Sequence, residues 1–155
     1  MTVDLFTCPP DVVSEGVLRE FVANAIASRL QAESLVVEFK RAADRNNVTN
    51  SIAAMANTNG GLTIVGVDEK AEDPFEGISA KQTDTIVQQL RALLPAAMPE
   101  VIPVALSDKV DRLVLVLRVD ADEVEPPVVL NGKVLVRVPG HTVGAGREEI
   151  RALFS

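Results

Sequence analysis

Residues 33–68 carry the strongest structural pattern in the chain and read ESLVVEFKRAADRNNVTNSIAAMANTNGGLTIVGVD. Residues 35–40 alternate between two faces, as in a β-strand. Apolar residues then recur at helical spacing between positions 48 and 59, and Gly60 stands where a left-handed residue commonly ends a helix. A short apolar run over 62–67 is typical of a buried strand. The stretch therefore predicts a strand, a helix and a second strand.

The segment before this stretch predicts one more helix. Residues 14–30 show helical spacing behind Ser14, a favourable N-cap residue, and residues 1–11 are expected to form a lead-in arm. After the stretch, a third helix begins with a capping box at Ser79 and Gln82.

The C-terminal half of the chain predicts mainly strands. Pro103 places its strand at the edge of a sheet, and Asn131-Gly132 is the strongest short hairpin signal in the sequence. The expected elements are strands at 101–106, 113–119, 128–130 and 134–138, and a closing helix at 147–154. The fold class is therefore α+β, with a mixed β-sheet flanked by helices in the order αβαβα-ββββ-α.

Composition points to one domain in the cytoplasm. The 155 residues are 47% hydrophobic, so they can bury a single core. We expect residues 1–32 (arm and first helix) and 33–155 to pack as one globular unit. No targeting segment or membrane span is evident. Cys8 and His141 are the only residues of their types, which excludes a structural zinc site built from these ligands.

Charge and aromatic content bear on nucleic-acid binding. The net charge of −7 argues against a uniformly basic surface, so binding would need a local basic patch or a bridging metal. The chain has no Trp or Tyr, which argues against a base-stacking face.

The residues that could carry chemistry are Glu33, Glu38, Lys40 and Asp68. The last three are expected at the ends of adjacent strands, and Glu38 and Lys40 share a face by the strand period of two. Three carboxylates and a lysine there could hold Mg²⁺ or Mn²⁺ and a phosphate. The alternative is that they are solvated strand ends, with Glu38 and Lys40 forming a surface ion pair.

Two other features can be interpreted either as functional or as purely structural. Residues 57–61 (NTNGG) could approach a ligand closely, or could only stop a helix before a strand. Arg137 is typical of a sheet surface. Nucleophilic catalysis has no support, because His141 would be the sole base.

The stretch at 33–68, together with residues 137–142 (RVPGHT), resembles the Schlafen-type AlbA-like domain family. The resemblance covers roughly residues 33–154. It implies a nucleic-acid-binding module and, in some relatives, a metal-dependent endoribonuclease that acts on structured RNA. The positions that match the family's catalytic carboxylates are Glu33, Glu38 and Asp68. Nuclease members often clamp RNA with two lobes, so a single lobe is expected to form a homodimer.

Three functions remain open at this point. The first is a DNA- or RNA-binding regulatory domain without catalysis, whose contacts would come from Lys40, Arg41, Arg45, Asn57 and Arg137. The second is a ribonuclease that uses Mg²⁺ or Mn²⁺ held by Glu33, Glu38 and Asp68. The third is a nucleotide-binding or protein-interaction module. The fold itself is expected to need no cofactor.

Overall fold

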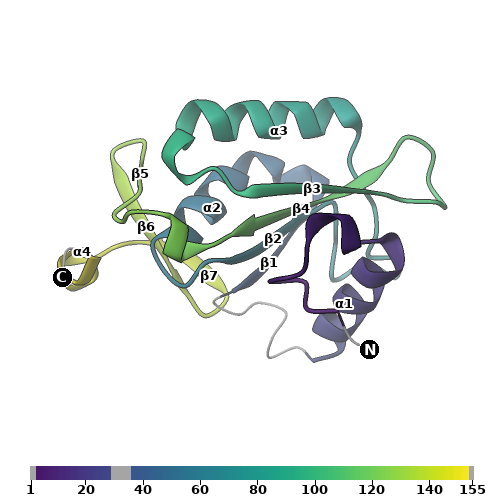
Figure 1. Ribbon diagram of the computed structural model, residues 1–155, viewed down its shortest axis with the longest axis horizontal. Coiled ribbons are helices and arrows are strands. Elements are labelled where there is room, and N and C mark those ends of the chain that lie inside the picture. Colours follow the sequence, from purple (N-terminus) through teal and green to yellow (C-terminus); the bar gives the residue numbers. More distant parts are fainter. Residues whose placement is uncertain (1–2, 29–35, 154–155) are drawn as a thin grey trace.

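A computed structural model describes residues 3–28 and 36–153. Figure 1 shows a central sheet with helices on both faces and a second, small sheet at one end. The helices are α1 (Glu15–Ala27), α2 (Val48–Ala56), α3 (Ala80–Leu93) and α4 (Arg147–Leu153). The strands are β1 (Val37–Lys40), β2 (Gly61–Val65), β3 (Glu100–Ala105), β4 (Leu113–Val119), β5 (Val129–Leu130), β6 (Lys133–Val138) and β7 (His141–Gly144). The predicted α+β class with a mixed sheet is confirmed.

The central sheet has the strand order β1-β2-β4-β3. β1 and β2 run parallel, whereas β4 is antiparallel to both β2 and β3. β3, which contains Pro103, lies at an edge as predicted. Since β1 and β2 are joined by α2, their carboxyl ends meet at the same edge of the sheet.

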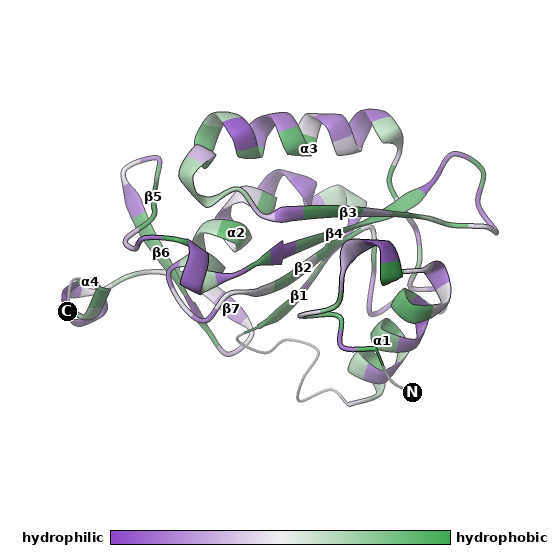
Figure 2. Cartoon of the chain, viewed as in Figure 1, coloured by the Kyte–Doolittle hydropathy of each residue, from purple (hydrophilic) through white to green (hydrophobic). Residues whose placement is uncertain are grey.

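Two apolar layers cover the sheet. α2 and α3 pack on one face around Ile52, Ile86 and Leu115. α1 packs on the other face around Leu18 and Ile64. The central strands are the most continuously apolar part of the chain, whereas the turns of α3 alternate between polar and apolar residues (Figure 2).

The N-terminal segment is part of the core, which differs from the expected lead-in arm. Leu5 is 1% exposed and belongs to the α1 side of the core. Pro10–Val12 forms a short 3-10 helix, and the Ser14 hydroxyl then accepts a hydrogen bond from the Val17 backbone N–H, as its predicted N-cap role requires. The apolar residues before Ser14 therefore stabilise the sheet rather than merely precede it.

The turn between α2 and β2 depends on glycine. α2 ends at Ala56, earlier than predicted, and the Gly60 N–H donates to the Met55 carbonyl after a three-residue turn. Gly60 has φ +70°, as expected. At Gly61 a β-carbon would lie 2.3 Å from the Val36 carbonyl oxygen, so no larger residue fits there.

The small sheet has the order β5-β6-β7 and packs against α2. Asn131 (φ 51°) and Gly132 (φ 76°) form the predicted two-residue turn between β5 and β6. The prediction of four strands after α3 was one short. β7 pairs with β6 because Pro139-Gly140 makes a second tight turn, with Gly140 at φ 77°.

Within residues 3–28 and 36–153, no helix combines the length and the apolar character needed to cross a membrane.

Candidate nucleic-acid interface

The parallel pairing of β1 and β2 brings most of the predicted site together. Glu38 and Lys40 come from β1, and Asp68 follows the end of β2. These three side chains and Arg41 line one cleft of about 410 Å³, called the first cleft below. Glu33, the remaining predicted residue, lies outside the described residues.

Both oxygens of the Glu38 carboxylate are engaged inside the protein. Oε1 lies 2.9 Å from Lys40 Nζ. Oε2 accepts hydrogen bonds from Ser51 Oγ and Arg137 Nη1, each at 2.8 Å. Ser51 Oγ also lies 2.7 Å from Thr63 Oγ1 on β2. Glu38 therefore joins β1, α2, β2 and β6 through one hydrogen-bonded network.

Arg137 is buried, which corrects its interpretation as a sheet-surface residue. Its side chain is only 1% exposed. The backbone N–H of Arg137 donates to Thr58 Oγ1 at 2.9 Å, while the guanidinium reaches Glu38 and Thr142. β6 directs this side chain toward α2, so Arg137 holds Glu38 in place from the interior of the protein.

The ion pair of Glu38 and Lys40 confirms that they share a face of the strand. Each side chain is 17% exposed, so the pair is more enclosed than the expected surface pair. A charge-assisted contact in such an environment is screened less than one in open water.

Two arginines follow β1 in the 3-10 helix region at 41–47. The Arg41 guanidinium donates to both carboxylate oxygens of Asp44, at 2.8 and 3.3 Å. These hydrogen bonds hold the pKa of Asp44 below its ordinary value. Arg45 Nη1 donates to the Ala42 carbonyl at 2.7 Å. Half of the Arg41 side chain remains exposed, so it could also meet a phosphate.

Asn57 has a structural task. It is buried, and its Nδ2 donates to the carbonyl oxygens of Val128 and Leu135, each at 2.9 Å. Its Oδ1 accepts from the Val128 N–H. All polar atoms of the amide are thus used to attach the small sheet to the end of α2.

A divalent metal would compete with groups that are already in place. Among the described residues, no cluster of three His, Cys, Asp or Glu side chains could hold a metal ion. Glu38 already has two cationic partners, and Asp68 Oδ1 accepts from the Lys70 N–H at 3.1 Å. Carboxylate oxygens suit Mg²⁺ and Mn²⁺ by type, but a metal at Glu38 would have to compete with the positive charges of Lys40 and Arg137.

A second cleft, of about 320 Å³, also has Glu38 and Lys40 in its wall. Asn47 and Asn50 line it from the start of α2, and His141 lines it from β7. Asn47 and Asn50 were not predicted from the sequence, and His141 was considered only as a zinc ligand or a catalytic base. The signal for the position of His141 was the Pro139-Gly140 turn, which brings it back alongside β6.

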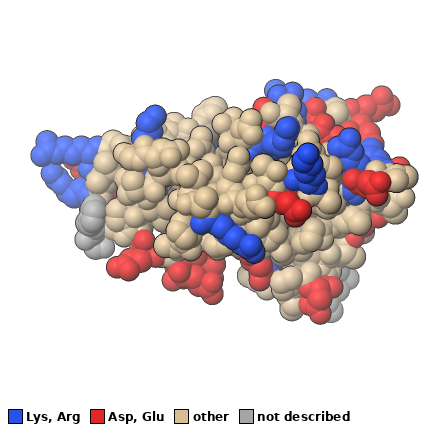
Figure 3. All heavy atoms as spheres, turned by 90° about the horizontal axis from the view of Figure 1, so that it is seen from above, with Lys and Arg blue, Asp and Glu red and all other residues tan. Residues whose placement is uncertain are grey.

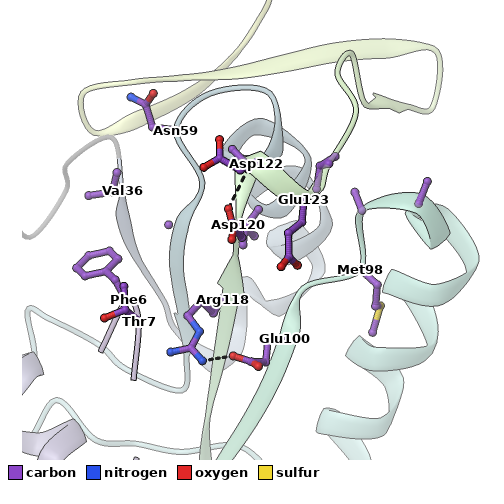
Figure 4. A pocket seen from close by; sticks show the side chains of 16 residues that line it. Phe6, Thr7, Val36, Asn59, Met98, Glu100, Arg118, Asp120, Asp122 and Glu123 are labelled. Atoms are coloured by element: carbon purple, nitrogen blue, oxygen red, sulfur yellow. Dashed lines mark hydrogen bonds and ion pairs between the residues drawn. The ribbon is translucent and has the colours of Figure 1, made fainter. Parts of the chain in front are cut away.

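A larger cleft, of about 630 Å³, lies where β4 ends and β2 begins, away from the predicted residues (Figure 4). Arg118 and Glu100 form an ion pair in its wall, and Asp120 accepts a hydrogen bond from the Asp122 N–H. Of its charged side chains, Arg118 and Glu100 are thus engaged with each other.

The face formed by α3 has no continuous basic surface. Figure 3 shows a broad uncharged middle, basic side chains at the end where α4 lies, and both signs of charge mixed at the opposite end. Because the chain carries a net charge of −7, its overall electrostatic field does not attract a polyanion. Any attraction must come from local basic groups.

Comparison with known proteins gives a family and a fold. Residues 33–145 match the family model described as Schlafen, AlbA_2. The crystal structure of the DIP2311 protein from Corynebacterium diphtheriae is similar, with a TM-score of 0.56 and 20% sequence identity. The similarity covers 85% of this chain and 31% of that protein, and at this identity it shows the fold alone. No curated protein matches the sequence.

Proposed function

Because this chain belongs to the Schlafen AlbA_2 family, we propose that it is a nucleic-acid-binding regulatory domain that acts without catalysis. The first cleft is the binding surface. Lys40 and Arg41 in this cleft, and Arg45 in the adjoining 3-10 segment, contact phosphate groups, and Arg137 and Asn57 support the surface from inside the fold.

The state of Glu38 is the observation that carries this proposal. A metal ligand offers uncompensated negative charge to the cation, whereas the charge of Glu38 is already balanced by Lys40 and Arg137, and Ser51 donates a hydrogen bond to it. A carboxylate used in this way orders the lysine beside it. It therefore serves to present Lys40 at the edge of the sheet.

The charge at the first cleft is also compatible with an anionic ligand. Four carboxylates line it, together with Lys40, Arg41 and Lys70, and Arg137 lies directly behind Glu38. The cleft is therefore close to neutral, although the chain as a whole carries −7. Cationic side chains that exchange an internal carboxylate for a phosphate give salt-dependent binding.

The alternative function is a metal-dependent endoribonuclease that uses Glu33, Glu38 and Asp68. It is favoured by the fact that Glu38 and Asp68 line the same cleft. In that function the metal would bind Glu38 beside the two cationic side chains that already contact it.

The proposal can be tested with fluorescently labelled single-stranded DNA and RNA. Anisotropy titrations across a salt series should give binding whose log K falls with log salt concentration. Three phosphate contacts predict a slope of about −2 for a single strand. In the double variant Arg41→Gln/Arg45→Gln, the slope should fall to about −0.7.

Arg91→Gln is the matched control, since Arg91 is an exposed arginine on α3, outside the segment 41–47 that carries Arg41 and Arg45 and outside the three clefts described above. Its binding and slope should equal those of the wild type. Absence of binding to both polymers at low salt would overturn the proposal, and so would an equal loss in the control variant.

A further inference from the structure

The two clefts that meet at Glu38 and Lys40 differ in chemistry. The first cleft is lined mainly by charged side chains. In the second cleft, Glu38 and Lys40 are the only charged lining residues, and Asn47, Asn50 and His141 provide neutral hydrogen-bonding groups. A phosphate is better matched by the first cleft and a neutral polar ring by the second.

The neutral polar side chains of the second cleft are available for hydrogen bonding to a ligand. Asn47, Asn50 and His141 are exposed, and within residues 3–28 and 36–153 their side chains make no hydrogen bond. Asn47 stands at the N-cap position of α2, where asparagine commonly bonds the first turn, yet it makes no capping bond. Three polar side chains that line one small cleft thus have donors and acceptors without a protein partner in the described part of the chain.

The size of the second cleft limits which ligand it can bind. A volume of about 320 Å³ is at the lower end of the range for ligand pockets, roughly 300–1,000 Å³. It accommodates one flat ring rather than a longer segment. Among the described residues, no Phe, Tyr or Trp lines it, so recognition would come mainly from hydrogen bonds to the ring edge, and the His141 imidazole is the only lining ring on which a base could stack.

We propose that the second cleft takes one unstacked base of a single-stranded nucleic acid whose phosphates lie along Lys40, Arg41 and Arg45. The inference rests on the proposed function and adds the class of polymer and the base-reading residues. Asn47 and Asn50 each offer an amide donor and acceptor, the arrangement that pairs with adenine. A duplex would not fit, because its bases remain stacked.

The test compares a single strand of deoxyadenosines with a strand of the same length that has abasic sugars throughout. Both strands keep their phosphates, so the ratio of the two affinities measures base recognition alone. Wild-type protein should bind the adenine strand at least about tenfold more tightly. Asn47→Ala/Asn50→Ala should bring the ratio close to one and leave affinity for the abasic strand unchanged.

Two further variants make the result specific. His141→Ala changes a different element and should also lower the ratio. Asn46→Ala is the matched control, because Asn46 is an exposed neighbour that does not line the cleft, and it should keep the wild-type ratio. Circular dichroism confirms that each variant is folded.

The outcomes separate this inference from the proposed function. If the wild type binds both strands equally, or if the ratio survives Asn47→Ala/Asn50→Ala, the base pocket is refuted while phosphate binding stands. If neither strand binds, the base pocket is refuted; if DNA and RNA also fail to bind in the anisotropy titrations, the proposed function fails with it.

Discussion

Replacing Glu38 with Gln is expected to destabilise the fold by about 3–5 kcal/mol, because a buried arginine would lose a carboxylate that pairs with it. The Arg137 side chain is 1% exposed and that of Glu38 is 17% exposed, so water can compensate little. Glutamine keeps the shape of the side chain and can still accept a hydrogen bond from Ser51. The loss therefore measures charge compensation. For a domain of this length it corresponds to a fall in Tm of roughly 6–20 °C.

Urea unfolding followed by circular dichroism measures the effect, provided that the m-value is unchanged. Glu100→Gln is the control, since that carboxylate pairs with Arg118 but is 44% exposed, and it should cost less than about 1 kcal/mol. The double variant Glu38→Gln/Arg137→Met should recover most of the loss. If Glu38→Gln leaves stability unchanged or raises it, the compensation argument is refuted, and Glu38 belongs to a repulsive acidic site.

Four further predictions use other parts of the molecule. Gly132→Ala should cost about 1–2 kcal/mol in urea unfolding, because the added methyl group meets nothing and only the positive φ is penalised. Gly60→Val should lower Tm much more, since its β-carbon would lie 2.5 Å from a carbonyl oxygen of β4. The hydrogen bond from Lys109 holds the pKa of Asp73 below its ordinary value. That contact stabilises the fold above about pH 4 and is lost as the pH falls through the lowered pKa, so Lys109→Met should return the Asp73 pKa toward normal in an NMR titration. In calorimetry, millimolar Mn²⁺ should leave Tm of the wild type and of Asp68→Asn unmoved; a wild-type rise that Asp68→Asn abolishes would favour the nuclease instead.

Sequence patterns correctly predicted the turns and caps that depend on residues close together in the chain. Asn131-Gly132 specifies its own turn, and Ser79 with Gln82 forms the predicted reciprocal cap. Gly60 takes positive φ because the chain must reverse within a few residues. The Pro139-Gly140 turn had an equally local signature, proline followed by glycine, and reading it would have predicted β7.

The site depended on contacts that no local pattern contains. Glu38 and Lys40 were paired correctly by the strand period, but the Arg137 partner lies 99 residues further along the chain. An isolated arginine in an alternating strand looks like a surface residue until the opposing helix is known. Asn57 likewise looked like a ligand residue, since nothing near it in sequence reveals that β5 and β6 would use its amide.

Asn57 also sets how the small sheet comes apart. One side-chain amide holds residues 128 and 135 to the end of α2, because it donates two hydrogen bonds and accepts a third. We therefore expect the backbone N–H of Val128 to exchange with solvent only when all three bonds open together, and not by fraying of the strand end. β7 belongs to the same sheet and carries His141. Each such opening would therefore separate the walls of the second cleft. A molecule bound between α2 and β7 would oppose the opening, and it would slow hydrogen exchange at the Val128 N–H although it does not contact that residue.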